Sequence, residues 1–203
     1  MSLENRAIFE RKLLEKLKEI ELSNSMIKAS KNKLKFKSGN KFVAELYIQH
    51  LARVDSYYLG GTVYGGAIFE GLSSIEPPYK SNVFNDSCCS FTTLGQEDKK
   101  FSLELGGAIK TPSLADVEAV CGHIKKVLED HYVPKIIACI IPGQRTIRDV
   151  LESPDEYSFP APFIYCAIKN DAKIVECGML DKVRQSKRVI KNKEFDLKLF
   201  EGF

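Results

Sequence analysis

The sequence contains no apolar run near the ~18 to 20 residues that a membrane-spanning helix requires. Its first residues lead into a charged stretch and lack the uncharged core of a secretion signal. We therefore expect a cytoplasmic protein without membrane contact. The 44% hydrophobic and 28% charged composition is that of a folded globular protein. It predicts a single domain over residues 1–203, with residues 155–203 as an appended C-terminal subdomain in the alternative.

Metal-binding and disulfide patterns are also missing. None of the six cysteines forms a Cys-x-x-Cys pair, and a chain of this size folds without crosslinks. Reduced and mostly buried thiols are the prediction, with a strained disulfide between the adjacent Cys88 and Cys89 as the alternative. His123 and His131 lie about two helical turns apart, too far to share one ion. We expect structural or surface roles for both and for His50, and neither metal nor cofactor.

Catalytic signatures are equally scarce. No Ser-His-Asp, Cys-His or paired-carboxylate spacing stands out, although an enzyme site assembled in space stays an alternative. The glycine pairs at 60–61 and 65–66 lack the Lys-Ser/Thr of a phosphate loop, and no helical pattern follows them. They indicate bent or closely packed strands instead.

The charge balance gives only a weak overall field, with a net charge of +3. A local excess of cations stands near the C-terminus, where it could follow phosphates as a nucleic-acid-binding segment. The alternative is a solvated helix face with Val183 and Ile190 turned inward. The cations are Lys182, Arg184, Lys187, Arg188, Lys191 and Lys193.

The first half of the chain combines one helix with several strands. Apolar residues recur at helical spacing over residues 3–22, from Phe9 through Leu13 and Leu17 to Ile20. Alternation over 33–37 and 42–49, around a connection with a glycine, predicts a hairpin. A third strand is expected over 57–69, a loop over 71–87, and a second hairpin from 91–94 and 101–105.

The second half begins with an amphipathic helix over 113–131, where Ser113 and Asp116 resemble a capping box. Its expected buried stripe is Leu114, Val117, Cys121, Ile124 and Leu128, and Pro134 should limit its length. A short helix over 146–152 and a hairpin from 163–168 and 173–177 follow, and a helix is one interpretation of the basic tail over 182–193. The fold class is therefore α+β, with a largely antiparallel sheet of hairpins packed against the N-terminal and central helices.

Tyrosine and arginine supply the candidate partner-binding residues. Tyrosine offers amphipathic contact area at low entropic cost, and arginine makes bidentate contacts to carboxylates. An ion-paired surface near Asp149 and Glu152 is the alternative role for the two arginines. The candidates are Tyr57, Tyr58, Tyr64, Tyr79, Arg145 and Arg148.

The order of these elements resembles the bacterial DUF4304 group of uncharacterised domains. The matching features are Phe36, Phe42, the tyrosine-rich strand with Gly60 and Gly61, and the segment 127–134. The long tail after Pro160 and the prolines at 77–78 depart from it. The resemblance implies an α+β protein, in some members an immunity partner of a secreted toxin.

A non-enzymatic, immunity-like protein-binding module of a bacterial cytoplasm is thus the leading hypothesis. A nucleic-acid-binding accessory protein that uses the C-terminal cations is the first alternative. An enzyme with a spatially assembled site is the second.

Overall fold

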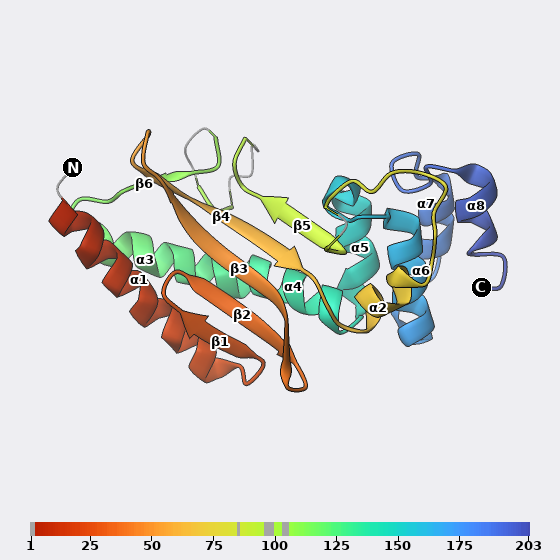
Figure 1. The fold of residues 1–203 in the computed structure, drawn as a ribbon, viewed down its shortest axis with the longest axis horizontal. Coiled ribbons are helices and arrows are strands. Elements are labelled where there is room, and N and C mark those ends of the chain that lie inside the picture. Colours follow the sequence, from red (N-terminus) through yellow and green to blue (C-terminus); the bar gives the residue numbers. More distant parts are fainter. Residues whose placement is uncertain (1–2, 85, 96–99, 103–105) are drawn as a thin grey trace. The chain divides into compact units, whose positions relative to one another are not determined.

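The computed structural model describes residues 3–84, 86–95, 100–102 and 106–203. It has the predicted α+β fold with a six-stranded sheet in the order β1-β2-β3-β4-β5, in which β6 also pairs with β4 (Figure 1). The strands are β1 Ile27–Ser30, β2 Lys33–Ser38, β3 Lys41–Leu51, β4 Ser56–Val63, β5 Cys89–Thr92 and β6 Ile109–Lys110. The helices are α1 Leu3–Ser23, α2 Ala67–Ser73, α3 Val117–Val127, α4 Val133–Ile140, α5 Gln144–Glu152, α6 Pro160–Asn170, α7 Met179–Gln185 and α8 Lys193–Lys198.

The chain forms two compact units, each made of two stretches of sequence. The first unit comprises Met1–Gly61 and Phe91–Pro134, and the second comprises Thr62–Ser90 and Lys135–Phe203. The segment 155–203 thus packs together with earlier parts of the chain in the second unit. The prediction of a single domain stays a prediction.

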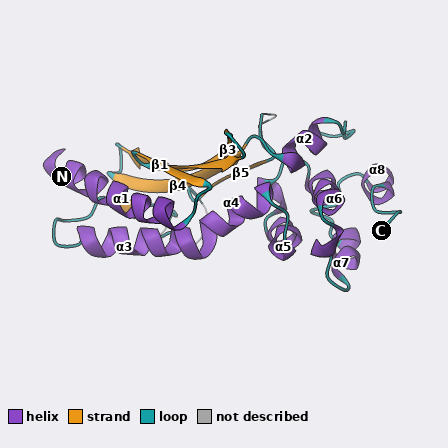
Figure 2. Ribbon diagram, turned by 90° about the horizontal axis from the view of Figure 1, so that it is seen from below, coloured by secondary structure: helices purple, strands orange, loops and turns teal. Residues whose placement is uncertain are grey.

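In the first unit, α1 and α3 pack on one face of the strands (Figure 2). The α1 stripe of Phe9, Leu13, Leu17 and Ile20 is buried, as its spacing predicts. The predicted hairpin is formed by β2 and β3, with Gly39 at a φ of 58° in the turn. The edge strand β1 was not predicted, because four residues are too few to show a clear alternation of polar and apolar side chains.

The glycine-rich strand ends earlier than predicted. β4 stops at Val63, and Gly66, with a φ of 95°, begins the seven-residue helix α2. The strand prediction for 57–69 was therefore wrong over its last residues, and a helix does follow this glycine pair. Ile68 and Leu72 are buried at the four-residue spacing of one helix face.

The central helix differs from its prediction at both ends. It begins at Val117, and the Ser113 hydroxyl donates to Asp116 Oδ2 at 2.6 Å instead of capping the backbone. Leu114 is consequently 56% exposed, whereas the rest of the predicted stripe is buried.

Pro134 does not end the helical path. The π-helical turn Leu128–Tyr132 lets the Val133 N–H reach back to the Leu128 carbonyl, and α4 then carries Pro134 in its first turn. The residue that this turn adds relieves the clash between a proline ring and the preceding turn.

In the second unit, the hairpin predicted from 163–168 and 173–177 was wrong. Residues 163–168 lie in α6, residues 173–174 belong to a short 3-10 helix, Ala172–Ile174, and residues 175–177 form no strand. Pro160 occupies the first helical turn, and α6 is buried on nearly every side, so no helical period was visible. The tail is helical in α7 and α8, but not over 186–192.

The cysteines and the second predicted hairpin complete the comparison with the sequence. All six cysteines are free thiols, and Cys177 alone among them is exposed, as expected for reduced and mostly buried cysteines. The second hairpin falls partly on residues 96–99 and 103–105, which lie outside the described residues. None of the described helices combines the length and the hydropathy that a membrane-spanning segment needs.

Candidate functional site

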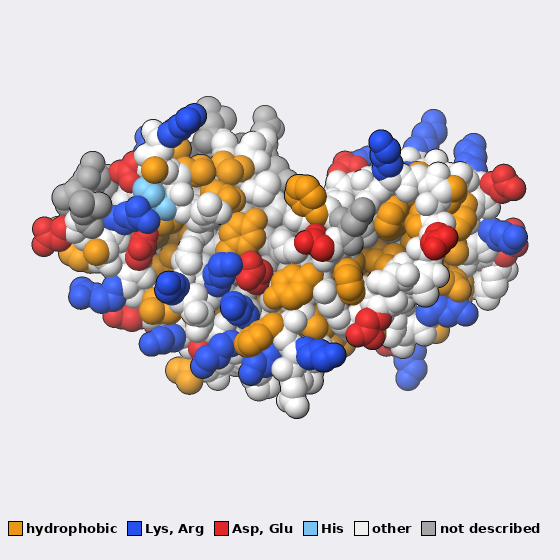
Figure 3. All heavy atoms as spheres, in the orientation of Figure 1, with side chains coloured by type: hydrophobic (Ala, Val, Ile, Leu, Met, Phe, Trp, Pro, Cys, Tyr) orange, Lys and Arg blue, Asp and Glu red, His pale blue; other side chains and the backbone are white. Residues whose placement is uncertain are grey.

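The sheet face opposite α1 and α3 is the surface with the most distinctive chemistry in the first unit. Alternate residues of the hairpin point to this face, while Leu34, Phe36, Leu46 and Ile48 point into the core. No described element of the first unit covers it, and Figure 3 shows lysine or arginine side chains beside hydrophobic ones over the strands. We call this surface the open face; it consists of Lys33, Lys35, Lys37, Phe42, Glu45, Tyr47, Gln49 and Tyr58.

Lysines and aromatic rings stand opposite one another on the open face. Lys33 pairs with Tyr47, Lys35 with Glu45, and Lys37 with Phe42 in the register of β2 and β3. The Lys33 ammonium lies 5.8 Å from the Tyr47 ring centroid, and the Lys35 and Lys37 ammoniums lie 5.6 and 5.2 Å from that of Phe42. These are cation–π distances. Lys33 also forms an ion pair with Glu45 at 2.9 Å.

A β-bulge places Phe42 on this face. Phe36 pairs with Ala44 but Lys37 pairs with Phe42, so Val43 is an extra residue in β3. Without this residue, strict alternation from the buried Ala44 would send Phe42 into the core. Instead Val43 and Ala44 are both buried, and Phe42 is 42% exposed. Bulges often re-aim a side chain near a functional surface.

Tyr47 extends across the neighbouring strand because Gly60 has no side chain. A Cβ atom at Gly60 would lie 2.3 Å from Cζ of Tyr47. The ring meets that of Tyr58 edge-on at a centroid distance of 6.3 Å, and the Tyr58 hydroxyl donates to Gln49 at 2.7 Å. Partial burial raises the pKa of Tyr47.

Two adjacent glycines offer a test of this arrangement. We expect Gly60→Ala to displace the Tyr47 ring at a cost below about 1 kcal/mol in the free energy of unfolding, because that side chain can swing outward. Gly61→Ala is the matched control: its Cβ would lie 2.5 Å from the buried Phe91 ring, and we expect a cost of about 2 to 3 kcal/mol. Urea denaturation gives both costs, and ring-to-ring NOEs report whether Tyr47 leaves Tyr58.

Of the predicted tyrosines, only Tyr58 belongs to the open face. Tyr57, its neighbour in β4, is 1% exposed and cannot serve as a surface anchor. Its hydroxyl donates to Glu10 at 3.0 Å, and its ring packs against Phe9 and His50. Burial raises its pKa above the ordinary range. Successive strand residues point to opposite faces, so one of the two had to lie in the core.

The other two tyrosines lie in the second unit. Tyr64 is 36% exposed just beyond the end of β4. Tyr79 is half-buried between Phe159 and Phe195, and its hydroxyl donates to the buried Asp196 at 2.7 Å. Tyr79 therefore connects the loop after α2 to the C-terminal tail.

Both predicted arginines form ion pairs within the second unit. Arg145 Nε donates to Asp149 Oδ2 at 2.7 Å, and Arg148 forms a pair with Glu176. Burial raises the pKa of Asp149, although Arg145 opposes that shift. The ion-paired alternative is thus confirmed: Arg145 pairs with Asp149, and Arg148 pairs with Glu176.

Three of the six predicted tail cations form hydrogen bonds or ion pairs within the second unit. Arg184 donates to the carbonyls of Phe200 and Phe203, Arg188 pairs with Asp155 at 2.7 Å, and Lys191 donates to Asn82. Lys182, Lys187 and Lys193 are exposed. Val183 and Ile190 are buried, as the solvated-face alternative predicts.

The three histidines have contacts of a structural kind. His50 Nε2 lies 3.0 Å from Asp55 Oδ1, and His123 Nε2 lies 3.0 Å from the Phe101 carbonyl. His131 packs against Tyr132. Among the described residues, no group of three or more histidine, cysteine or acidic side chains could hold a metal ion.

Comparisons of the chain with protein-family models, with curated proteins and with solved structures found no match. The resemblance to the DUF4304 group therefore stays a prediction.

Proposed function

We propose that this protein is a non-catalytic protein-binding module of the bacterial cytoplasm, and that the open face holds its partner. The observation that carries the proposal is that Lys33, Lys35 and Lys37 lie beside the partly exposed ring of Tyr47 and the exposed ring of Phe42. Tyrosine and other aromatic residues commonly dominate binding energy at protein interfaces. The lysines favour a partner with an acidic surface.

Three features favour a protein over a nucleic acid on this face. Glu45 lies among the lysines and forms an ion pair with Lys33, which disfavours a phosphate there. Lysine ammoniums already lie over the rings of Tyr47 and Phe42, where bases would have to stack. The net charge of +3 is also low for a dedicated nucleic-acid-binding protein.

The β1 edge of the sheet is protected against pairing with a partner strand. The Glu21 carboxylate accepts the backbone N–H of Ala29 in β1 at 3.0 Å and pairs with Lys28 at 2.6 Å. An unpaired edge would otherwise invite added strands. We therefore propose recognition through side chains of the open face. The resemblance to the DUF4304 group adds an immunity role, in which the partner would be a secreted toxin.

Charge reversal tests the proposed face. We expect the double variant Lys35→Glu, Lys37→Glu to weaken partner binding about 100-fold or more, because like charges then face the acidic partner. The tail variant Lys187→Glu, Lys193→Glu changes the net charge equally and is the matched control; we expect its affinity to stay within about threefold of wild type. Binding partners would be captured from host lysate with and without nuclease treatment, and a captured protein would be purified and titrated calorimetrically against wild type and each variant.

Two results would contradict the proposal. Equal affinity of the open-face variant and the wild type, with intact folding by circular dichroism, would remove the open face from recognition. A ligand that nuclease destroys, and that the tail variant no longer binds, would establish the nucleic-acid alternative.

A further inference from the structure

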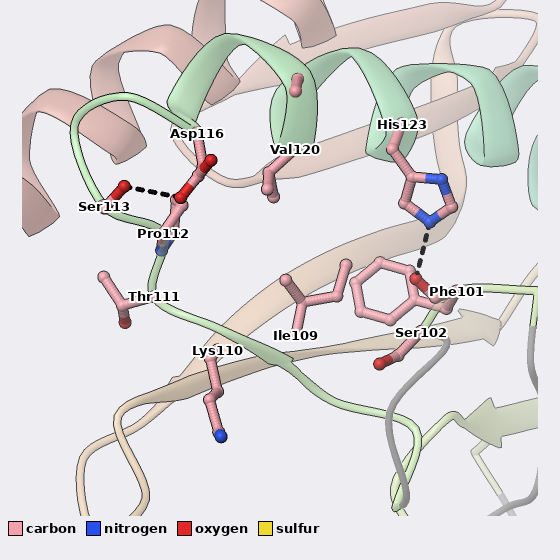
Figure 4. A pocket seen from close by; sticks show the side chains of 11 residues that line it. Phe101, Ser102, Ile109, Lys110, Thr111, Pro112, Ser113, Asp116, Val120 and His123 are labelled. Atoms are coloured by element: carbon pink, nitrogen blue, oxygen red, sulfur yellow. Dashed lines mark hydrogen bonds between the residues drawn. The ribbon is translucent and has the colours of Figure 1, made fainter.

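A hollow of about 490 Å³ lies in the first unit between α3 and the described residues of the 101–113 segment. Its size falls in the range of small-molecule sites. Figure 4 shows Phe101, Ile109 and Val120 along its middle, with Ser113 and Asp116 at one end and Ser102 and His123 at the other. The hollow is therefore apolar along its length and polar at its two ends.

The Asp116 end carries a negative charge that faces water. Asp116 takes the N-cap position of α3, but its carboxylate makes no capping bond to the backbone. It accepts instead from the Ser113 hydroxyl at 2.6 Å. Lys110, the basic residue among those that line the hollow, points away from α3 in Figure 4. The carboxylate and the Ser113 oxygen can thus accept further hydrogen bonds from a ligand.

The other end is fixed by a hydrogen bond within the protein. A backbone carbonyl can only accept, so Nε2 of His123 carries the hydrogen in its 3.0 Å contact with the Phe101 carbonyl. This bond holds the imidazole against the end of the hollow. Ser102 similarly donates to the Ala108 carbonyl at 2.7 Å. These contacts leave the carboxylate as the group that selects a charged ligand.

We infer that this hollow binds a small primary amine with an apolar body. The ammonium would donate to Asp116 and Ser113, and an aromatic or branched alkyl body would lie on Ile109 and Val120. Apolar contact supplies the affinity, while the carboxylate selects an amine over a neutral molecule of the same shape. This inference is independent of the open face and of any protein partner.

The probe is 2-phenylethylamine, titrated into the full chain with chemical shifts of the Ile109 and Val120 methyl groups as the readout. The neutral isostere 2-phenylethanol is the matched ligand. We expect the amine to bind about fivefold more tightly than the alcohol, the usual scale for one exposed ion pair. Asp116→Asn should weaken amine binding about fivefold and leave alcohol binding unchanged.

A second variant tests the apolar walls. Val120→Phe would fill the hollow and should reduce the affinity for both ligands at least tenfold. Equal affinities of wild type for amine and alcohol, or an amine affinity that Asp116→Asn does not change, would overturn the inference. Absence of saturable shifts with either ligand would overturn it as well.

Discussion

Asp196→Ala should lower the free energy of unfolding of the second unit by about 3 to 5 kcal/mol. The carboxylate is fully buried. It accepts the Tyr79 hydroxyl at 2.7 Å, the Lys191 N–H at 2.8 Å and the Asn192 N–H at 2.9 Å. Alanine would leave all three donors without this buried acceptor. The backbone that leads into α8 would lose two hydrogen bonds, those of the Lys191 and Asn192 N–H groups.

Tyr79→Phe separates the contribution of the Tyr79 hydroxyl from that of all three donors to Asp196. This variant removes the hydroxyl but keeps the ring contacts with Phe159 and Phe195, so we expect a loss of about 1 to 2 kcal/mol. Because the chain has no tryptophan, urea denaturation would be followed by circular dichroism, with hydrogen exchange reporting on α8. A loss below about 1 kcal/mol in the free energy of unfolding for Asp196→Ala would contradict the stabilising role given to this carboxylate.

The regular parts of the fold were predictable because their period is visible in the sequence. The α1 stripe and the β2–β3 hairpin each have one buried face, so apolar residues recur at one spacing. Elements without such a period were missed. α6 is buried on nearly every side, and α2 is a short helix between a strand and a loop. The prediction that Pro134 limits the helix was wrong because a proline is plain in the sequence, whereas the π-helical turn that accommodates it has no comparable signature.

The residues of the open face could be predicted only in part, for a different reason. Composition identified tyrosine as an interface residue but did not say which tyrosine faces solvent. Tyr57 and Tyr58 are adjacent, and only the packing of α1 decides that Tyr57 is the buried one. The bulge at Val43 reverses the alternation of β3, which a period of two cannot reveal. The alternating lysines at 33, 35 and 37 were the signal that could have located the open face.

The second large effect is expected at Lys135, which is buried in the second unit. Its side chain is 8% exposed and forms an ion pair with Glu156, whose side chain is 14% exposed. Burial lowers the pKa of Lys135, but the facing Glu156 carboxylate outweighs it and the pKa ends above its ordinary value. Lys135→Met would leave Glu156 without this cation, and we expect a loss of about 3 kcal/mol.

The double variant Lys135→Met, Glu156→Leu is expected to recover most of that loss, because it removes both charges and fills the same space.

The sign of the pH dependence supplies a second readout. A raised lysine pKa stabilises the folded state fully below the ordinary value of 10.5, and that contribution disappears as pH rises through the folded-state pKa. The tyrosines titrate in both proteins, so the difference between wild type and double variant isolates Lys135. Wild-type stability should therefore fall relative to the double variant above about pH 10.5. A double variant no more stable than Lys135→Met would show that Lys135 contributes through packing and not through its charge.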